Sequence, residues 1–123
     1  MGGASREEPV LTETQFEIRS SWEGENAILE VSGEVDMATA PEMTGAVEAA
    51  VDAARLVVVD LTEATFLDSA AINGLIRCRR ELDERGVAFA VVSPPDGVVR
   101  KALEITNVVD RLGVVDSRAD AAA

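Results

Sequence analysis

The stretch that decides the fold is RLVVVDLTEATFLDSAAINGL, residues 55–75. It begins with a continuous aliphatic and β-branched run, which is typical of a strand covered on both faces in the centre of a parallel sheet. Residues 62–65 predict a connection, and from residue 69 the apolar positions recur at helical spacing. The stretch is therefore a strand, a connection and a helix. Sites in open α/β sheets lie beyond the carboxyl ends of the strands, so this connection is the first place to expect one.

Strands and helices alternate on both sides of this unit. The expected elements are two strands between residues 14 and 36 joined by a turn at 23–26, a helix over about 39–54, a strand over 87–93, and a helix over about 94–106 followed by a last short strand and a short helix. This order predicts an α/β domain with a mixed, mainly parallel sheet that opens with an antiparallel hairpin.

Single residues mark the ends of these helices. Thr39 is a plausible N-cap, and Pro41 suits a first helical turn because its missing N–H would have no partner there. Gly86 stands where the helix after Ser69 should stop, and Asn107 stands where a left-handed helix-ending residue is expected. Gly74 lies inside a predicted helix, where it indicates close packing against a neighbouring element.

Composition removes several classes of enzyme. The 123 residues contain no histidine, so the chain has no Ser-His-Asp triad, no imidazole base and no histidine-ligated metal. Cys78 is the single cysteine, which excludes an internal disulfide and a cysteine metal cluster. A carboxylate-only metal site stays possible in principle. We expect no cofactor and no bound metal.

Charge and hydropathy restrict the partners. The net charge is −12, from 23 acidic and 11 basic residues, and such a surface does not attract nucleic acid or an anionic membrane. No apolar run approaches the length of a membrane span, and MGGASREEPV at the start lacks the features of a signal peptide. We therefore expect a cytoplasmic protein that meets neither nucleic acid nor membrane. The acidic surface either keeps the protein solvated or meets a basic protein partner.

Two possible functions of residues 60–69 conflict with the rest of the sequence. A hydrolase would use Ser69 as its nucleophile, but the flanking glycines of a nucleophile elbow are missing and no histidine can take the proton. A phosphoacceptor receiver domain would use Asp60 at the end of its strand. Such a domain also needs an acidic pair after its first strand and a lysine after a late one, whereas Lys101 lies inside a predicted helix. Asp60 is better explained as a structural residue that binds loop N–H groups.

A third reading makes Ser69 a phosphorylation site. A serine at a helix start exposes its hydroxyl near unpaired N–H groups, and the helix dipole favours a phosphate there. The phosphate would add about −1.5 to −2 charges beside Asp68 and Asp36, which would repel a partner docked on this loop. From physics alone, Ser69 or Asp68 as a plain helix cap is the favoured explanation.

Three segments together resemble the STAS domain family. They are SGEVDMATAPEM (32–43), LVVVDLTEATFLDSAAINGL (56–75) and ERGVAFAVVSPPDGVVRKALEITNVVDRL (84–112). More closely, they are similar to bacterial anti-sigma factor antagonists. The resemblance implies a small α/β sandwich, with a mixed sheet of about five strands and helices mainly on one side. It divides the chain into a flexible leader (1–11), a STAS domain (12–118) and a flexible tail (119–123).

The resemblance also implies a function. Stand-alone members bind an anti-sigma factor that is also a serine kinase, and this binding frees the sigma factor. The kinase then uses its own ATP to phosphorylate a serine at the head of the second helix, and a phosphatase resets the protein. By motif match this serine is Ser69. The partner-binding residues that the match implies are Gly33, Asp36, Thr39, Phe66, Asp68, Ser69, Ala71 and Asn73.

One residue departs from the family pattern. Ala71 stands where the family usually has glycine, and its methyl group could change how closely a kinase approaches the loop.

From the resemblance as a whole, we expect an anti-sigma factor antagonist that is not an enzyme and that is switched off at Ser69. The alternative is a STAS-fold interaction module without phosphoregulation, which acts as a constitutive partner or scaffold.

Overall fold

The sheet has five strands in the spatial order β1-β2-β3-β4-β5, in a computed structural model that describes residues 16–122. The strands are β1 (Phe16–Glu23), β2 (Asn26–Val35), β3 (Leu56–Leu67), β4 (Ala88–Val92) and β5 (Val114–Val115). β1 and β2 form an antiparallel hairpin, and every other neighbouring pair is parallel. The predicted mixed, mainly parallel sheet is confirmed. The leader proposed for residues 1–11 lies outside the described residues.

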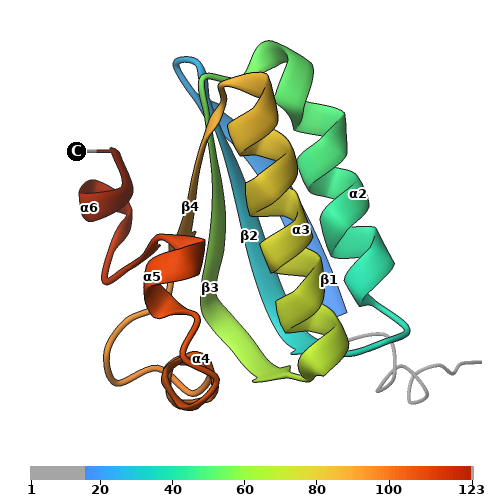
Figure 1. The fold of residues 1–123 in the computed structure, drawn as a ribbon, viewed down its shortest axis with the longest axis vertical. Helices are drawn as coiled ribbons and strands as arrows, with labels where there is room; N and C mark the ends of the chain where they lie inside the picture. The colour runs from blue at the N-terminus through green and yellow to red at the C-terminus, as the bar shows by residue number, and fades with distance from the viewer. Residues whose placement is uncertain (1–15, 123) are drawn as a thin grey trace, which may run out of the picture.

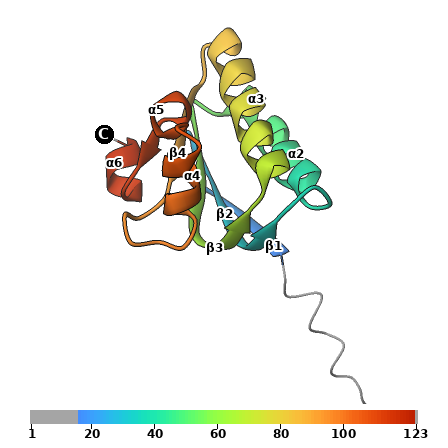
Figure 2. The same cartoon turned by 60° about the horizontal axis from the view of Figure 1, so that its bottom comes forward.

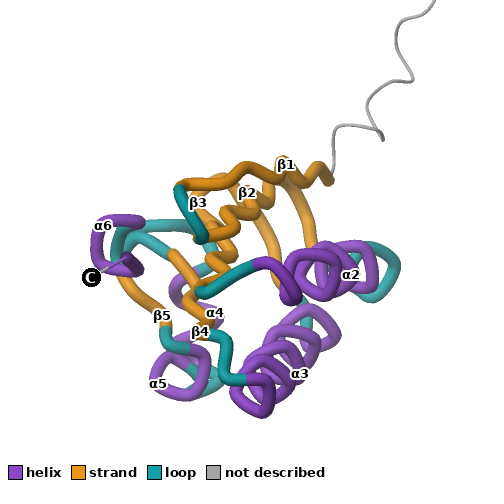
Figure 3. The backbone as a smooth tube through the Cα atoms, turned by 90° about the horizontal axis from the view of Figure 1, so that it is seen from above, coloured by secondary structure: helices purple, strands orange, loops and turns teal. Residues whose placement is uncertain are grey.

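The two longest helices cover one face of this sheet. α2 (Ala40–Ala50), extended by a 3-10 turn at Val51–Ala53, and α3 (Ser69–Arg85) lie side by side across it (Figure 1). Two short helices, α4 (Arg100–Ile105) and α5 (Val109–Leu112), connect β4 to β5. α6 (Arg118–Ala122) lies on the opposite face of the sheet, as the view from above shows (Figure 3). No helix within residues 16–122 is both long enough and apolar enough to span a membrane.

The hydrophobic core is divided unequally between the two faces. Beneath α2 and α3, inward side chains such as Leu29, Met43 and Leu75 are completely buried. The other face holds only a small cluster of Ile28, Val58 and Val92, which α6 helps to cover through Ala121. Each fully buried aliphatic side chain contributes about 1.5–3 kcal/mol, so most of the stability comes from the α2–α3 side. Most of the opposite face, under β1 and β2, is left to polar side chains.

Several local predictions are confirmed. Gly86 and Asn107 adopt positive φ angles of 74° and 64° at the ends of α3 and α4. A Cβ added to Gly74 would lie 2.9 Å from Cγ2 of Thr44, so Gly74 lets α3 approach α2. Thr39 is the N-cap residue of α2, but its hydroxyl makes no capping hydrogen bond and is used elsewhere.

The structure corrects two boundaries. The expected connection at residues 62–65 is part of β3, which runs to Leu67 and stays paired with β2. The pairing shifts register twice, between Glu30 and Ser32 and between Gly33 and Glu34, and Gly33 takes a φ of 87° at the second shift. These bulges break the alternation that normally identifies a strand. At the other end, residues 119–122 are helical as part of α6, although they were expected to form a flexible tail.

Candidate functional site

The candidate site is the edge of the sheet where β2 and β3 end. Val35 and Leu67 are the last paired residues of the two strands, and the N–H of Asp68 donates to the carbonyl of Val35 at 3.1 Å. Beyond this point β2 leads into α2 and β3 leads into α3. The first turns of both helices therefore lie at the same end of the molecule (Figure 2). Asp36, the residue after Val35, therefore lies at the same edge as the end of β3 and the start of α3.

Asp68 links the two segments through its carboxylate. It is the N-cap residue of α3, and its Oδ1 accepts a hydrogen bond from the N–H of Ala71 at 2.9 Å. Its Oδ2 accepts a hydrogen bond from the N–H of Met37 at 3.0 Å, across 31 residues of sequence. One side chain therefore caps a helix and also binds the loop that precedes α2.

Asp36 and Thr39 hold that loop in shape. Oδ1 of Asp36 accepts hydrogen bonds from the N–H groups of Ala38 (2.9 Å) and Thr39 (3.2 Å). The Thr39 hydroxyl accepts from the N–H of Asp36 at 3.0 Å and lies 3.1 Å from the carbonyl oxygen of Glu34. The turn over residues 36–39 is thus closed by its own side chains, as in an Asx turn.

The surface around Ser69 is apolar and acidic. Ser69 is the first residue of α3 and is exposed. Two large apolar side chains lie in the adjoining segments, Met37 at 76% exposure and Phe66 at 47%. Asn73 is exposed one helical turn after Ser69. Met37 was not among the residues expected from sequence, although its position directly after Asp36 in the turn could have indicated it.

Two of the expected residues do not present a side chain at this surface. Ala71 is fully buried, because its side chain points into the core between α3 and the sheet; only its backbone N–H takes part, as the donor to Asp68. Its side chain is therefore not presented at this surface, and its place among the partner-binding residues stays a prediction. Gly33 lies inside β2 at the second register shift, so its contribution is to the path of the backbone.

Asp60 lies away from this edge. It pairs with Glu30 and Val92 in the middle of the sheet, on the face opposite α2 and α3, and is 7% exposed. Its Oδ1 accepts from the N–H and the hydroxyl of Thr62 at 3.0 and 2.5 Å, and its Oδ2 accepts from Nε of Arg118 at 2.8 Å. The carboxylate is thus held within the protein.

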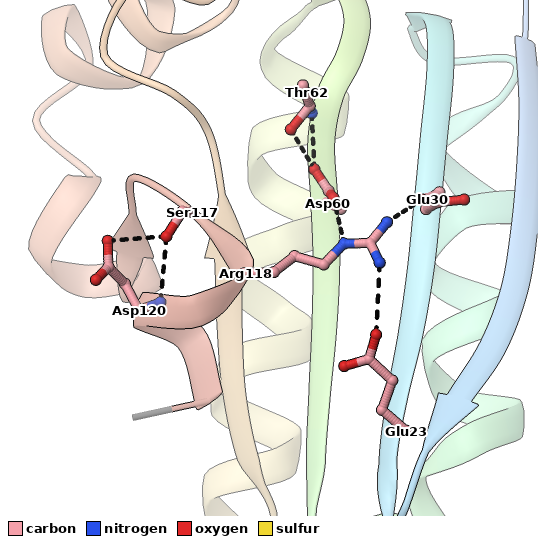
Figure 4. Close-up of polar contacts among 7 residues, drawn as sticks. All are labelled: Glu23, Glu30, Asp60, Thr62, Ser117, Arg118 and Asp120. Atoms are coloured by element: carbon pink, nitrogen blue, oxygen red, sulfur yellow. Dashed lines mark hydrogen bonds and ion pairs between the residues drawn. The ribbon is translucent and has the colours of Figure 1, made fainter.

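Arg118 contacts three carboxylates on the face of the sheet opposite α2 and α3. Besides Asp60 it forms ion pairs with Glu30 and, at 3.7 Å, with Glu23 (Figure 4). It lies at the start of α6, so these contacts fasten α6 to the sheet. Arg118, Asp60 and Glu30 also border an open hollow of about 450 Å³ over β1, β2 and β3. Within residues 16–122, no three acidic or sulfur-bearing side chains are arranged to hold a metal ion.

Cys78 is buried in α3. Burial, with a smaller effect of Glu48 and Glu81, raises the pKa of its thiol to about 11. The thiolate is the reactive form of cysteine, so this residue is an inert part of the core at neutral pH.

The family follows from comparison with known sequences. A sequence model of the STAS domain matches residues 18–121. The chain belongs to the STAS domain family. An anti-sigma factor antagonist from Mycobacterium paratuberculosis has a similar structure, with a TM-score of 0.78 and 26% identity over 87% of this chain and 91% of that one. The phosphorylated form of the Bacillus cell fate determinant SpoIIAA shares the fold, with a TM-score of 0.62 and 15% identity over 85% of this chain and 95% of that one.

Part of the chain also matches a segment of a much longer protein. Low affinity sulfate transporter 3 of Stylosanthes hamata is 35% identical over 66 residues, which make up 54% of this chain. The match spans about a tenth of that transporter, 10% of its length. The predicted STAS-like fold is confirmed, with a five-stranded mixed sheet and the main helices on one side.

Proposed function

We propose that this STAS protein is an anti-sigma factor antagonist whose partner is an anti-sigma factor with serine kinase activity. Binding of the partner frees a sigma factor, and phosphorylation of Ser69 ends the binding. The observation that supports this most directly is the exposed Ser69 at the first position of α3, beside a turn that Asp68 ties to the same helix. The similarity to the M. paratuberculosis antagonist supports the choice of partner.

The surface suits a protein partner. Met37 and Phe66 offer exposed apolar area, and Glu34, Asp36 and Asp68 place carboxylates around it. Apolar contacts in a protein interface supply affinity, and charges at the rim select the partner and speed association. We therefore expect the partner to present an apolar surface bordered by basic residues. Thr39 is partly exposed in the turn before α2, and Asn73 is exposed in α3, four residues after Ser69.

The proposed reaction takes place on the partner. The kinase transfers the γ-phosphoryl group of ATP to Oγ of Ser69: the new O–P bond forms as the bond to ADP breaks, and the hydroxyl proton passes to a base on the kinase. ATP belongs to the kinase, so this chain needs no cofactor and is not itself an enzyme. A phosphatase later hydrolyses the ester. Because sigma factors and ATP are cytoplasmic, the proposal places the protein in the cytoplasm.

Phosphate at Ser69 is compatible with the fold. A helix N-terminus favours negative charge, so the modified domain stays folded. The added charge of about −1.5 to −2 stands next to Asp68 and opposes any partner that approaches Met37 and Phe66. The modification therefore changes binding without unfolding the domain.

The test is to incubate the protein with anti-sigma kinases from its own genome and ATP, and to map the phosphate by mass spectrometry. Phosphate on Ser69, with partner binding lost in Ser69→Asp and kept in Ser69→Ala, is the expected result. Ser117→Ala is a matched control, because Ser117 is also an exposed serine just before a helix. Binding that ignores both Ser69 substitutions would contradict the switch and favour the constitutive STAS module.

A further inference from the structure

The two oxygens of the Asp68 carboxylate bind two different segments of the chain. Oδ1 binds the N–H of Ala71 in α3, and Oδ2 binds the N–H of Met37 in the turn before α2. We propose that Asp68 is a positioning residue that fixes the 36–39 turn against the head of α3, and that a phosphate on Ser69 releases this turn. The release by phosphate rests on the proposed function, whereas the positioning role of Asp68 does not.

The turn keeps its shape without Asp68. Asp36 binds the N–H groups of Ala38 and Thr39, and the Thr39 hydroxyl binds the N–H of Asp36. The contact between Met37 and Asp68 is of a different kind, because it joins two segments that are 31 residues apart. Loss of this contact would leave a formed turn in a changed position. The residue most affected is Met37, whose side chain is 76% exposed.

A phosphate on Ser69 would disturb both contacts of Asp68 together. Ser69 directly follows Asp68, so the phosphate oxygens compete for the N–H groups of the first helical turn, including that of Ala71. The phosphate also repels the neighbouring carboxylate. Because both oxygens belong to one rigid carboxylate, a rotation that takes Oδ1 away from Ala71 also moves Oδ2 away from Met37.

Release of the 36–39 turn differs from simple repulsion of a partner. Under repulsion alone, the phosphorylated protein keeps the same surface and only its charge changes. Under the inference, the free phosphorylated protein already has Met37 displaced relative to Phe66. The difference can be measured with no partner present.

The experiment is amide hydrogen exchange and methionine methyl NMR on the free protein. Asp68→Asn and Asp68→Ser each keep one oxygen that can cap α3, but neither offers a second acceptor to Met37. In both variants we expect the Met37 amide to exchange about tenfold faster, which corresponds to the loss of about one hydrogen bond. The Ala71 amide and the methyl signal of buried Met43 should stay unchanged. An unchanged Met37 amide and methyl signal in both variants would overturn the positioning role.

The regulatory half is tested in the same assay. Protein with phosphoserine installed at position 69 should show the same change at Met37, while the amides of Ala38 and Thr39 keep their protection through Asp36. If Met37 responds to the Asp68 variants but not to the phosphate, the release by phosphorylation is wrong and the positioning role stands. If no kinase phosphorylates or binds the protein, the proposed function fails, and the result for the Asp68 variants is unaffected.

Discussion

Asp60 and Asp68 lie eight residues apart on and just after the same strand, yet their carboxylates are held in different ways. Asp60 is 7% exposed and is bound mainly by side chains, the Thr62 hydroxyl and the Arg118 guanidinium. Asp68 is partly exposed and is bound by two backbone N–H groups from two different segments. The first arrangement fastens a helix to the sheet. The second places a charge where a neighbouring modification can change how two segments meet.

The difference between Asp60 and Asp68 should have its largest effect on the free energy of unfolding. Arg118→Leu removes the counter-charge of a buried carboxylate and leaves Asp60 and Glu30 facing one another across the strands. Because Arg118 is about one-third exposed (35% of its side chain), we expect a loss of about 2 kcal/mol, below the range for a fully buried pair. Urea denaturation followed by circular dichroism measures the change.

The control for this prediction is Arg111→Leu, since Arg111 is an exposed arginine in α5. It should change the free energy of unfolding by less than about 0.5 kcal/mol. The double variant Arg118→Leu, Asp60→Asn should recover part of the loss, because it no longer buries an unpaired charge. A loss in Arg118→Leu no larger than in Arg111→Leu would show that Asp60 does not depend on its partner.

A smaller effect is expected at the other aspartate. Asp68→Ala removes the cap of α3 and the contact with Met37, which should lower the free energy of unfolding by about 1 kcal/mol. Asp68→Asn keeps the cap and should cost about half as much or less. Thermal unfolding of the two variants side by side checks the order. Equal losses in both variants would mean that the cap contributes little and that the negative charge itself is what matters.

The smallest expected effect on stability is at Ser69. Ser69→Asp places a carboxylate in the first turn of α3, where the helix dipole favours it, so the domain should be unchanged or more stable by about 0.3–1 kcal/mol. Partner binding should nevertheless be lost. This combination separates a switch from a structural defect. A Ser69→Asp variant that unfolds at a clearly lower temperature would remove the physical basis for phosphate at this position.

The fold, and the position of Ser69 at the start of a helix, could be predicted from particular residues. The run at 55–61 identifies a central strand because only a strand covered on both faces tolerates such continuous apolar sequence. Ser69 could be placed at a helix start because the apolar spacing changes there. The extension of β3 through residues 62–67 could not be predicted, because two bulges break the alternating pattern and only pairing with β2 maintains the strand.

The contacts that set the two aspartates apart were also beyond sequence reasoning. Arg118 lies 58 residues from Asp60, and nothing in the local pattern around either residue indicates that they meet. The N–H of Met37 is a backbone donor, which no side-chain motif reveals. The burial of Ala71 was not predicted for a related reason. Its position in the helix alone does not show that its methyl group points into the core.

In our proposal, the edge around Asp68 and Ser69 is a partner surface, and phosphate on Ser69 abolishes binding there. The most direct measurement is the affinity of the anti-sigma kinase for this protein, by calorimetry, before and after complete phosphorylation of Ser69. We expect binding to be at least about 100-fold weaker after phosphorylation, which corresponds to about 2.7 kcal/mol. Affinities that agree within twofold would contradict it.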